Sequence, residues 1–271
     1  MIRKAVVAGQ FYPGSKNSLL KEVERLVDKK QGCGKVDAMG VFSPHAGYIY
    51  SGPVAGKVFS AIKPKSTYVI MGPSHTGLGA PFAISPSDLW RTPLGEVKTD
   101  RALADEILRN SKYVTYDELP HAHEHSIEVQ LPFLQFIQKG FKFVPMVISY
   151  GTIDVYREVG RSLAKSLKVL NMEKDVTIIA SSDMTHYEPQ ESAKRKDSIA
   201  IKAMLELNEE ELTREVSEFD ISMCGYAPAI VMLTAVKELG AKSASLLKYM
   251  TSGDITGDYS SVVGYAGIVI T

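Results

Sequence analysis

The sequence predicts one α/β domain over residues 1–271, with a mainly parallel central sheet between two layers of helices. Short apolar runs alternate with amphipathic helical patterns along the whole chain, as expected where helices join parallel strands. A length of 271 residues would suit one large domain or two small ones. No linker, low-complexity run or fixed-period repeat divides the chain, which favours a single domain.

Apolar runs bounded by turn residues predict the strands of this sheet. A hairpin or covering excursion is expected around Trp90 to Val97, where proline and glycine interrupt the pattern. A short extended segment is expected at Ala5 to Ser15. The core strands are expected at 38–42, 68–71, 141–148, 176–180, 245–250 and 262–270.

Residues with helical spacing fill the intervals between the strands. Ser15 or Ser18 is a candidate cap for a first helix that carries Leu19, Val23 and Leu26, and Asp100 caps a helix to about Asn110. The remaining helices are expected at 52–62, 126–137, 153–169, 190–207, 209–218 and 228–239.

The composition excludes several classes of protein. Hydrophobic residues make up 45% and charged residues 23% of the chain, as in ordinary soluble domains, and the formal net charge is zero. Without a basic field, nucleic acid is not an expected partner. No apolar run reaches the roughly 20 residues that span a bilayer, and the start of the chain has no signal-peptide pattern. Two cysteines suggest no disulfide framework, and a cytoplasmic location is expected.

Polar side chains follow three of the expected strands. His45 lies just after the strand 38–42, His75 after 68–71, and Asp183 with His186 after 176–180. In open α/β sheets, functional groups gather at the carboxyl edge of the strands. We therefore expect these side chains to share one cleft. A single histidine in a loop is more often a hydrogen-bonding group, and the hypothesis depends on the repetition.

These residue types also suit a metal site. Neutral imidazole is a common ligand of zinc, copper and iron, and Cys224 lies just before a helix, where a thiol pKa is lowered. His45, His75 and Cys224 are thus a plausible ligand set with an open position. Asp183 and His186 could orient each other, with His186 as general acid or base. A single cysteine such as Cys224 is more often a small buried residue than a ligand, and Cys33, between two glycines, fits an incidental surface thiol.

Three further motifs lack the required context. His121 to His125 fits the inverted zinc-protease pattern H-x-x-E-H, but it follows a Leu-Pro pair rather than lying within a continuous helix. The segment 72–77 has one residue too many for a nucleophile elbow, and no phosphate-binding loop is present. Glu124 and His125 are expected at the wall of the cleft, or as a polar cap on the helix that begins near Ser126.

Six blocks spread along almost the whole chain resemble the MEMO family, named for a mediator of cell motility. The blocks are Gly9–Gly14, Pro44–Tyr48, Gly72–His75, His123–Phe133, Ser181–His186 and Thr251–Asp258. This family is similar in fold to the class III extradiol dioxygenases, which are non-haem iron enzymes. The resemblance implies a metal site at His45, His75 and Cys224, with Asp183 and His186 beside it. It also implies that His123, Ser74 and Tyr48 belong to the pocket.

The resemblance also bears on the metal and the partners. Cys224 takes the place of the carboxylate that completes the two-histidine iron site of the dioxygenases. A thiolate favours softer or redox-active ions, so iron or copper is expected and zinc less so. Some prokaryotic members are encoded near AMMECR-type and radical-SAM proteins, which implies a modification pathway without naming a substrate.

The sequence is compatible with three functions. The first is a metal-dependent redox enzyme acting on a small molecule or peptide in the cleft. The second is a non-catalytic peptide-binding or scaffold protein that retains the pocket. The third is a hydrolase that uses Ser74 or Ser182 with His186. The fold does not distinguish them, because function resides in the site. Assembly into a homo-oligomer is compatible with all three.

Overall fold

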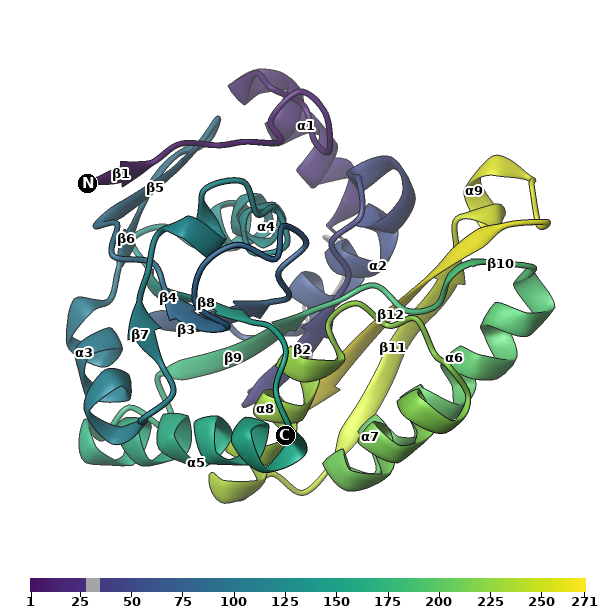
Figure 1. Cartoon of the computed structure of the whole chain (residues 1–271). Helices are drawn as coiled ribbons and strands as arrows, with labels where there is room; N and C mark the ends of the chain where they lie inside the picture. The colour runs from purple at the N-terminus through teal and green to yellow at the C-terminus, as the bar shows by residue number, and fades with distance from the viewer. Residues whose placement is uncertain (28–34) are drawn as a thin grey trace.

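A mixed β-sheet runs through the middle of the molecule, and helices cover both of its faces (Figure 1). The computed structural model of the chain describes residues 1–27 and 35–271. The loop expected around Cys33 therefore lies outside the described residues. The α/β fold with helices on both faces of one sheet is as predicted.

The centre of the sheet is parallel. Its strands are β2 (Gly40–Ser43), β3 (Thr67–Gly72), β8 (Lys142–Ile148) and β9 (Val176–Ser181), in the order β8-β3-β9-β2. Each neighbouring pair in this group is parallel. The carboxyl ends of these strands therefore meet at one edge of the sheet, where the predicted cleft should lie.

Strands on both sides of this centre introduce antiparallel pairs, so the sheet as a whole is mixed. On one side, β12 (Val262–Ile270) pairs antiparallel with β2, and β10 (His186–Glu188) and β11 (Ala244–Thr251) both pair with β12. On the other side lie β1 (Ile2–Arg3), the hairpin of β5 (Leu89–Thr92) and β6 (Gly95–Thr99), and the short β4 (Phe82–Ile84) and β7 (Thr115–Tyr116).

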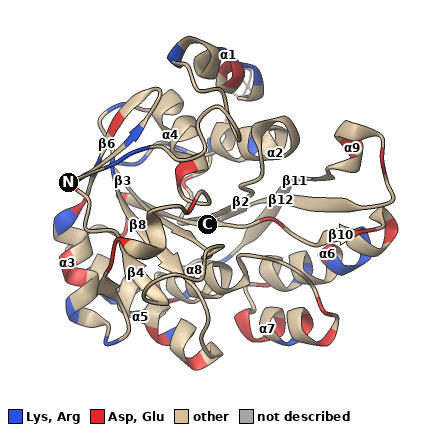
Figure 2. Cartoon of the chain, turned by 45° about the horizontal axis from the view of Figure 1, so that its top comes forward, with Lys and Arg blue, Asp and Glu red and all other residues tan. Residues whose placement is uncertain are grey.

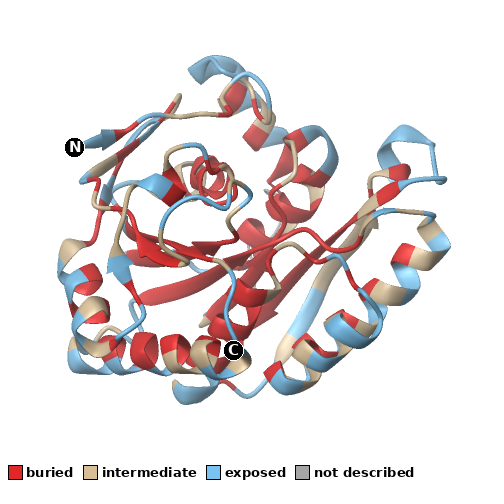
Figure 3. Ribbon diagram, viewed as in Figure 1, coloured by how far each residue is buried: buried red, intermediate tan, exposed pale blue. Residues whose placement is uncertain are grey.

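The central strands of the sheet are buried (Figure 3), and their alternating side chains belong to two cores. In β3, Val69 and Met71 belong to one core and Tyr68 and Ile70 to the other, as the period of two in a strand requires. One face is covered by α1 (Lys16–Leu26), α2 (Tyr48–Ala61) and α4 (Leu131–Ile137). The other is covered by α3 (Arg101–Asn110), α5 (Ile153–Val169), α6 (Gln190–Leu205), α7 (Glu209–Glu218) and α8 (Tyr226–Glu238).

Several elements coincide with the sequence prediction and others do not. The helices 153–169 and 209–218 and the strand 262–270 have the predicted bounds, and Ser15 and Asp100 cap their helices. The helix expected from 52 begins at Tyr48, with Gly52 and Pro53 inside it. The turn cluster after Thr251 contains the short helix α9 (Gly253–Thr256). The segment 119–130 forms two 3-10 turns, η1 (Leu119–His121) and η2 (Glu128–Gln130).

Charged side chains lie mainly on the outer helices, where lysine and arginine are interspersed with aspartate and glutamate (Figure 2). This distribution agrees with the net charge of zero. Within the described ranges, no helix is both long and apolar enough to cross a membrane.

Candidate metal centre

The carboxyl edge of the parallel strands brings three histidine rings together. His45 follows β2, His75 follows β3, and His125 comes from the segment between η1 and η2. The ring centroids of His45 and His75 are 5.1 Å apart, those of His45 and His125 5.4 Å, and those of His75 and His125 4.5 Å. One nitrogen from each ring lies within 4.8 Å of the others. This cluster, the histidine trio, can hold a metal ion.

The buried carboxylate of Glu124 orients two members of the trio. Its Oε2 accepts a hydrogen bond from the backbone N–H of His75 at 2.7 Å, and its Oε1 accepts one from the ring Nδ1–H of His75 at 2.9 Å. Because an ionised carboxylate only accepts, Nδ1 of His75 carries the hydrogen and Nε2 keeps its lone pair. The same Oε1 accepts the backbone N–H groups of His125 and Ser126, each at 2.9 Å.

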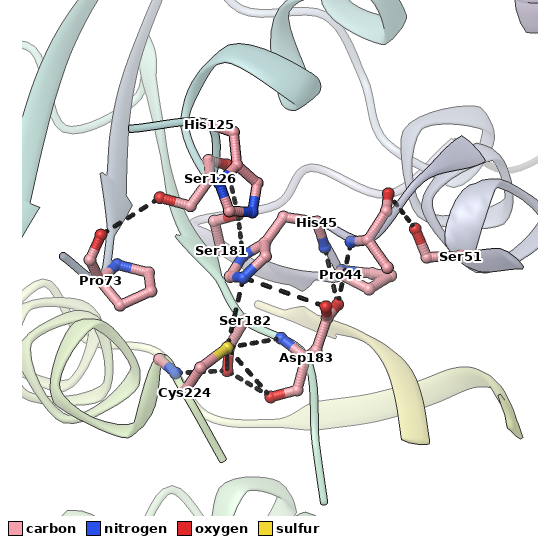
Figure 4. Close-up of polar contacts among 12 residues, drawn as sticks. Pro44, His45, Ser51, Pro73, His125, Ser126, Ser181, Ser182, Asp183 and Cys224 are labelled. Atoms are coloured by element: carbon pink, nitrogen blue, oxygen red, sulfur yellow. Dashed lines mark hydrogen bonds and ion pairs between the residues drawn. The ribbon is translucent and has the colours of Figure 1, made fainter. Parts of the chain in front are cut away.

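Cys224 and Asp183 lie on the other side of the His45 ring (Figure 4). The sulfur of Cys224 is 3.2 Å from Nε2 of His45 and accepts the backbone N–H of Asp183 at 3.3 Å. Oδ1 of Asp183 accepts the backbone N–H of His45 at 2.8 Å, which ties the loop after β2 to the loop after β9. Cys224 is not part of the histidine trio but contacts one of its members.

Burial and neighbouring charges give these groups different protonation behaviour. Burial, and then the charges of His75 and His125, lower the pKa of His45 well below its usual value. Burial also lowers the pKa of His125 to about 4. Burial opposes protonation of His75 too, but the hydrogen bond and charge of Glu124 outweigh it and raise the pKa. Burial raises the pKa of Cys224 to about 12 and that of Asp183 to about 6.

A cavity of about 600 Å³ opens onto the histidine trio. Asp183 and His186 line it together with the trio. Aromatic side chains form much of its remaining wall, and hydroxyl groups and Asp258 come from the segment between β11 and β12. These further lining residues are Phe11, Tyr50, Tyr187, Ser252, Thr256, Asp258, Ser261, Val263 and Tyr265. The edge of the sheet thus holds the histidine trio and, beside it, a cavity large enough for a small molecule.

Comparison with known proteins identifies the family. The family model described as Memo-like protein matches residues 3–269. A MEMO1 family protein of Methanocaldococcus jannaschii is 45% identical over 99% of both chains. The chain belongs to the Memo-like family. Another MEMO1 family protein, from Aquifex aeolicus, is 43% identical over 99% of this chain and 98% of its own length.

A solved structure supports the fold independently of the sequence relatives. An uncharacterised protein from Escherichia coli K12 superposes with a TM-score of 0.60, over 85% of this chain and 98% of that one. The sequence identity is 14%, so this likeness shows the fold alone.

Five residues predicted from sequence and from the family resemblance lie around the cavity. His45, His75, His125, Asp183 and His186 line it. Glu124 lies directly behind His75 and is almost fully buried, so it holds the ring rather than facing a substrate. Asp183 and His186 do not orient each other: Nδ1 of His186 lies 2.8 Å from the carbonyl oxygen of Ser222 and therefore donates to it.

Four other predicted residues lie away from the larger cavity. Tyr48 is buried. Its hydroxyl donates a hydrogen bond to the carbonyl oxygen of Val129 at 2.6 Å, and its ring packs on Phe133. Ser74 and Cys224 line a separate cavity of about 190 Å³. His123 is exposed and is not among the described residues that line either cavity.

The alternative motifs of the sequence find no catalytic geometry. His121 is fully buried and its Nε2 lies 3.2 Å from the carbonyl of Ala83, so it does not pair with His125 as a zinc-protease motif requires. For the hydrolase, Oγ of Ser182 donates to the carbonyl of Asp183, and Oγ of Ser74 accepts the N–H of Gly77. In the part of the chain that the structure describes, neither serine has a hydrogen bond to His186.

Two residues that support the site were not predicted from the sequence. Ser181 and Gln130 are both fully buried and lie beneath His45. A serine at the end of a strand and a glutamine at the start of a helix carry no distinctive signal, and only the fold places them against the ring.

Proposed function

We propose that this Memo-like protein binds a redox-active transition metal, iron or copper, and uses it on a small molecule or peptide in the cavity. The observation that carries the proposal is the convergence of His45, His75 and His125 on one point of a cavity wall. Imidazoles suit iron, copper and zinc, and the open cavity leaves a coordination position for water or substrate.

The third ligand has two candidates. His125 belongs to the histidine trio, whereas Cys224 lies 3.2 Å from Nε2 of His45. Two first-shell atoms at about 2.0–2.3 Å from an ion lie roughly 3–3.6 Å apart, so this separation suits a shared ion. We propose His45, His75 and Cys224 as the ligands, with His125 beside them. A thiolate in the set favours copper and iron over harder ions.

Loading this site would release a proton. Burial holds the pKa of Cys224 at about 12, so the free thiol is protonated at neutral pH. A metal ligand must be a thiolate, and coordination therefore displaces that proton. His45 needs no such change, because burial and the neighbouring histidines keep its pKa low and its ring neutral.

Asp183 and His186 are the proposed proton-transfer groups. Asp183 has a pKa of about 6 and lies on the cavity wall, so it changes protonation near neutral pH. His186 donates from Nδ1 to Ser222, which leaves Nε2 to accept a proton from a ligand in the cavity. The bound metal would supply Lewis-acid or redox chemistry, and these two groups would move protons beside it.

The cavity wall suggests the character of the substrate. The described residues that line it include aromatic rings and two carboxylates, Asp183 and Asp258, but no lysine or arginine. Such a wall favours a neutral or cationic molecule with a flat apolar part over a phosphorylated or otherwise anionic one.

Metal spectroscopy decides between the two third ligands. Co(II) bound to a thiolate shows an intense sulfur-to-metal charge-transfer band that imidazole ligands do not give. We expect this band in the wild type and in His125→Ala, and its loss in Cys224→Ser. His123→Ala is the matched control, because this nearby histidine is exposed and lines neither cavity.

Two results would count against the proposal. Wild-type protein that binds Co(II) without this band, with binding kept in Cys224→Ser and lost in His125→Ala, would replace the thiolate by the third imidazole. Protein that binds neither Fe(II) nor Cu(I) but still binds peptides would instead favour the scaffold function.

A further inference from the structure

A chain of buried hydrogen bonds lies beneath His45, on the side of the ring away from Cys224 (Figure 4). Nδ1 of His45 is 3.0 Å from Oγ of Ser181. That hydroxyl also contacts the side chain of Gln130 and the backbone of Ser126. Ser181, Gln130 and Ser126 are entirely buried, and His45 is 2% exposed. Bulk solvent therefore does not reach these groups.

Gln130 has only one orientation that satisfies its neighbours. One end of its amide lies 2.9 Å from the carbonyl oxygen of Pro44, which can only accept. That end must be the NH2 group, and its second hydrogen points to Oγ of Ser181 at 2.8 Å. The amide oxygen then accepts the hydroxyl of Ser43 at 3.0 Å. Reversing the amide would place oxygen against oxygen at Pro44.

The hydroxyl of Ser181 has only one hydrogen to donate. The carbonyl oxygen of Ser126 lies 2.6 Å away and can only accept, so it takes this hydrogen. Gln130 donates to one lone pair of the hydroxyl. The second lone pair remains for Nδ1 of His45, and the imidazole must therefore donate there.

We infer that Ser181 and Gln130 are positioning residues that hold the hydrogen of His45 on Nδ1 and direct the Nε2 lone pair toward the metal site. Two backbone carbonyls, of Pro44 and Ser126, set the direction of every bond in the chain. A metal-ligating histidine commonly has its second nitrogen fixed in this way by an outer group. The inference rests on the proposed metal site for its purpose, but the position of the hydrogen can be measured without metal.

The same network determines how Nε2 of His45 pairs with Cys224. With the hydrogen on Nδ1, Nε2 of His45 can only accept from the protonated thiol, 3.2 Å away. In the opposite tautomer, Nε2–H would point at the sulfur and block both as ligands. In the Nδ1–H tautomer that Ser181 and Gln130 favour, loss of the thiol proton frees the nitrogen and the sulfur together.

Nitrogen-15 NMR of metal-free protein tests the inference directly, because a ring nitrogen with a hydrogen and one with a lone pair resonate far apart. The His45 signals are assigned by their absence from His45→Gln. We expect protonated Nδ1 and unprotonated Nε2 in the wild type. In Ser181→Ala, Nδ1 has no acceptor, and the population should shift toward the Nε2–H form.

Two matched variants separate orientation from packing. Ser181→Thr retains the hydroxyl and should retain the wild-type tautomer. Ser43→Ala removes a serine hydroxyl from the neighbouring strand β2 and breaks its hydrogen bond to Gln130. The Ser43 hydroxyl has no hydrogen bond to the His45 ring among the described contacts. This variant should leave the tautomer unchanged. Affinity for Co(II) should fall by about 10–100-fold in Ser181→Ala and stay near the wild type in Ser43→Ala.

Each outcome bears on the inference. A wild-type spectrum with the hydrogen on Nε2 would overturn it, even if Ser181→Ala does not fold. A Ser181→Ala spectrum identical to the wild type would remove the positioning role. The expected tautomer in a protein that binds no metal would support the inference and count against the proposed function alone.

Discussion

Glu124 accepts two hydrogen bonds from His75, one from the backbone at 2.7 Å and one from the ring at 2.9 Å. Its carboxylate is nearly inaccessible to solvent, and it also accepts the backbone N–H groups of His125 and Ser126. One side chain thus joins the loop after β3 to the segment that carries His125. The position of two imidazoles in the histidine trio depends on this single charge.

Replacement of Glu124 by glutamine should destabilise the fold. The amide keeps one accepting oxygen, and its NH2 group faces backbone N–H groups that then lack a partner. A buried unsatisfied group costs about 1–3 kcal/mol, and urea unfolding should show a loss of that size. Glu96→Gln is the control, because Glu96 forms an exposed pair with Arg91 and should change stability by less than about 1 kcal/mol. Equal stability of the two variants would contradict this role.

Metal affinity should fall on mild acidification because of His75. Glu124 raises the pKa of His75, so this ring takes up a proton at a higher pH than its neighbours. His45 and His125 have lowered pKa values and stay neutral over the same range. A proton on Nε2 competes with the metal, in addition to the thiol proton of Cys224 that binding displaces at every pH in this range. Affinity should therefore fall more steeply with decreasing pH below the pKa of His75 than above it.

Chelator competition with Co(II) between about pH 8 and about pH 5 measures this dependence. The Glu124→Gln variant should lose affinity at lower pH than the wild type, since the charge that raises the pKa of His75 is gone. A wild-type affinity that does not change over this interval would be inconsistent with His75 as a ligand.

Arg3 should be needed for the stability of the fold. Its guanidinium pairs with the buried carboxylate of Glu128 and donates to the carbonyl oxygens of His121 and Glu124. Arg3→Ala leaves a buried charge without its partner, which costs about 3–5 kcal/mol in unfolding free energy. Arg25→Ala is the control: its pair with Glu22 is exposed and should contribute less than about 1 kcal/mol. A similar melting temperature in both variants would show that the remaining donors to Glu128 suffice.

Much of the fold follows from local sequence. Val262–Ile270 is a run of apolar residues, and Ile153–Val169 has a strong helical stripe with Thr152 as its cap, so both elements were predicted with their observed bounds. The short strands β4, β7 and β10 were missed, because two or three residues give no periodic signal. Their pairing partners, not their own sequences, determine them.

The antiparallel additions were also beyond local sequence. An apolar strand looks the same in either direction, and only its partners define parallel or antiparallel pairing. The chain therefore predicts the parallel centre from its helical crossovers but not that β12 returns antiparallel along β2.

The site was predictable where strand ends were recognisable. His45 and His75 follow apolar runs, and the parallel pairing of β2 and β3 with β9 brings them to one edge. His125 was expected only at the wall, because its segment follows no strand. Ser181 and Gln130 act through hydrogen bonds between elements far apart in the sequence, and no local pattern reveals such contacts.

Anaerobic calorimetric titration of Fe(II) and of Cu(I) tests the central claim most directly. The wild type and the control His123→Ala should each bind one ion of at least one of these metals. His75→Ala should lose more than about a hundredfold in affinity, because even outer-shell changes cost about 10–100-fold. Equal binding by the wild type and His75→Ala, or no binding of either ion, would contradict a metal centre that has His75 as a ligand.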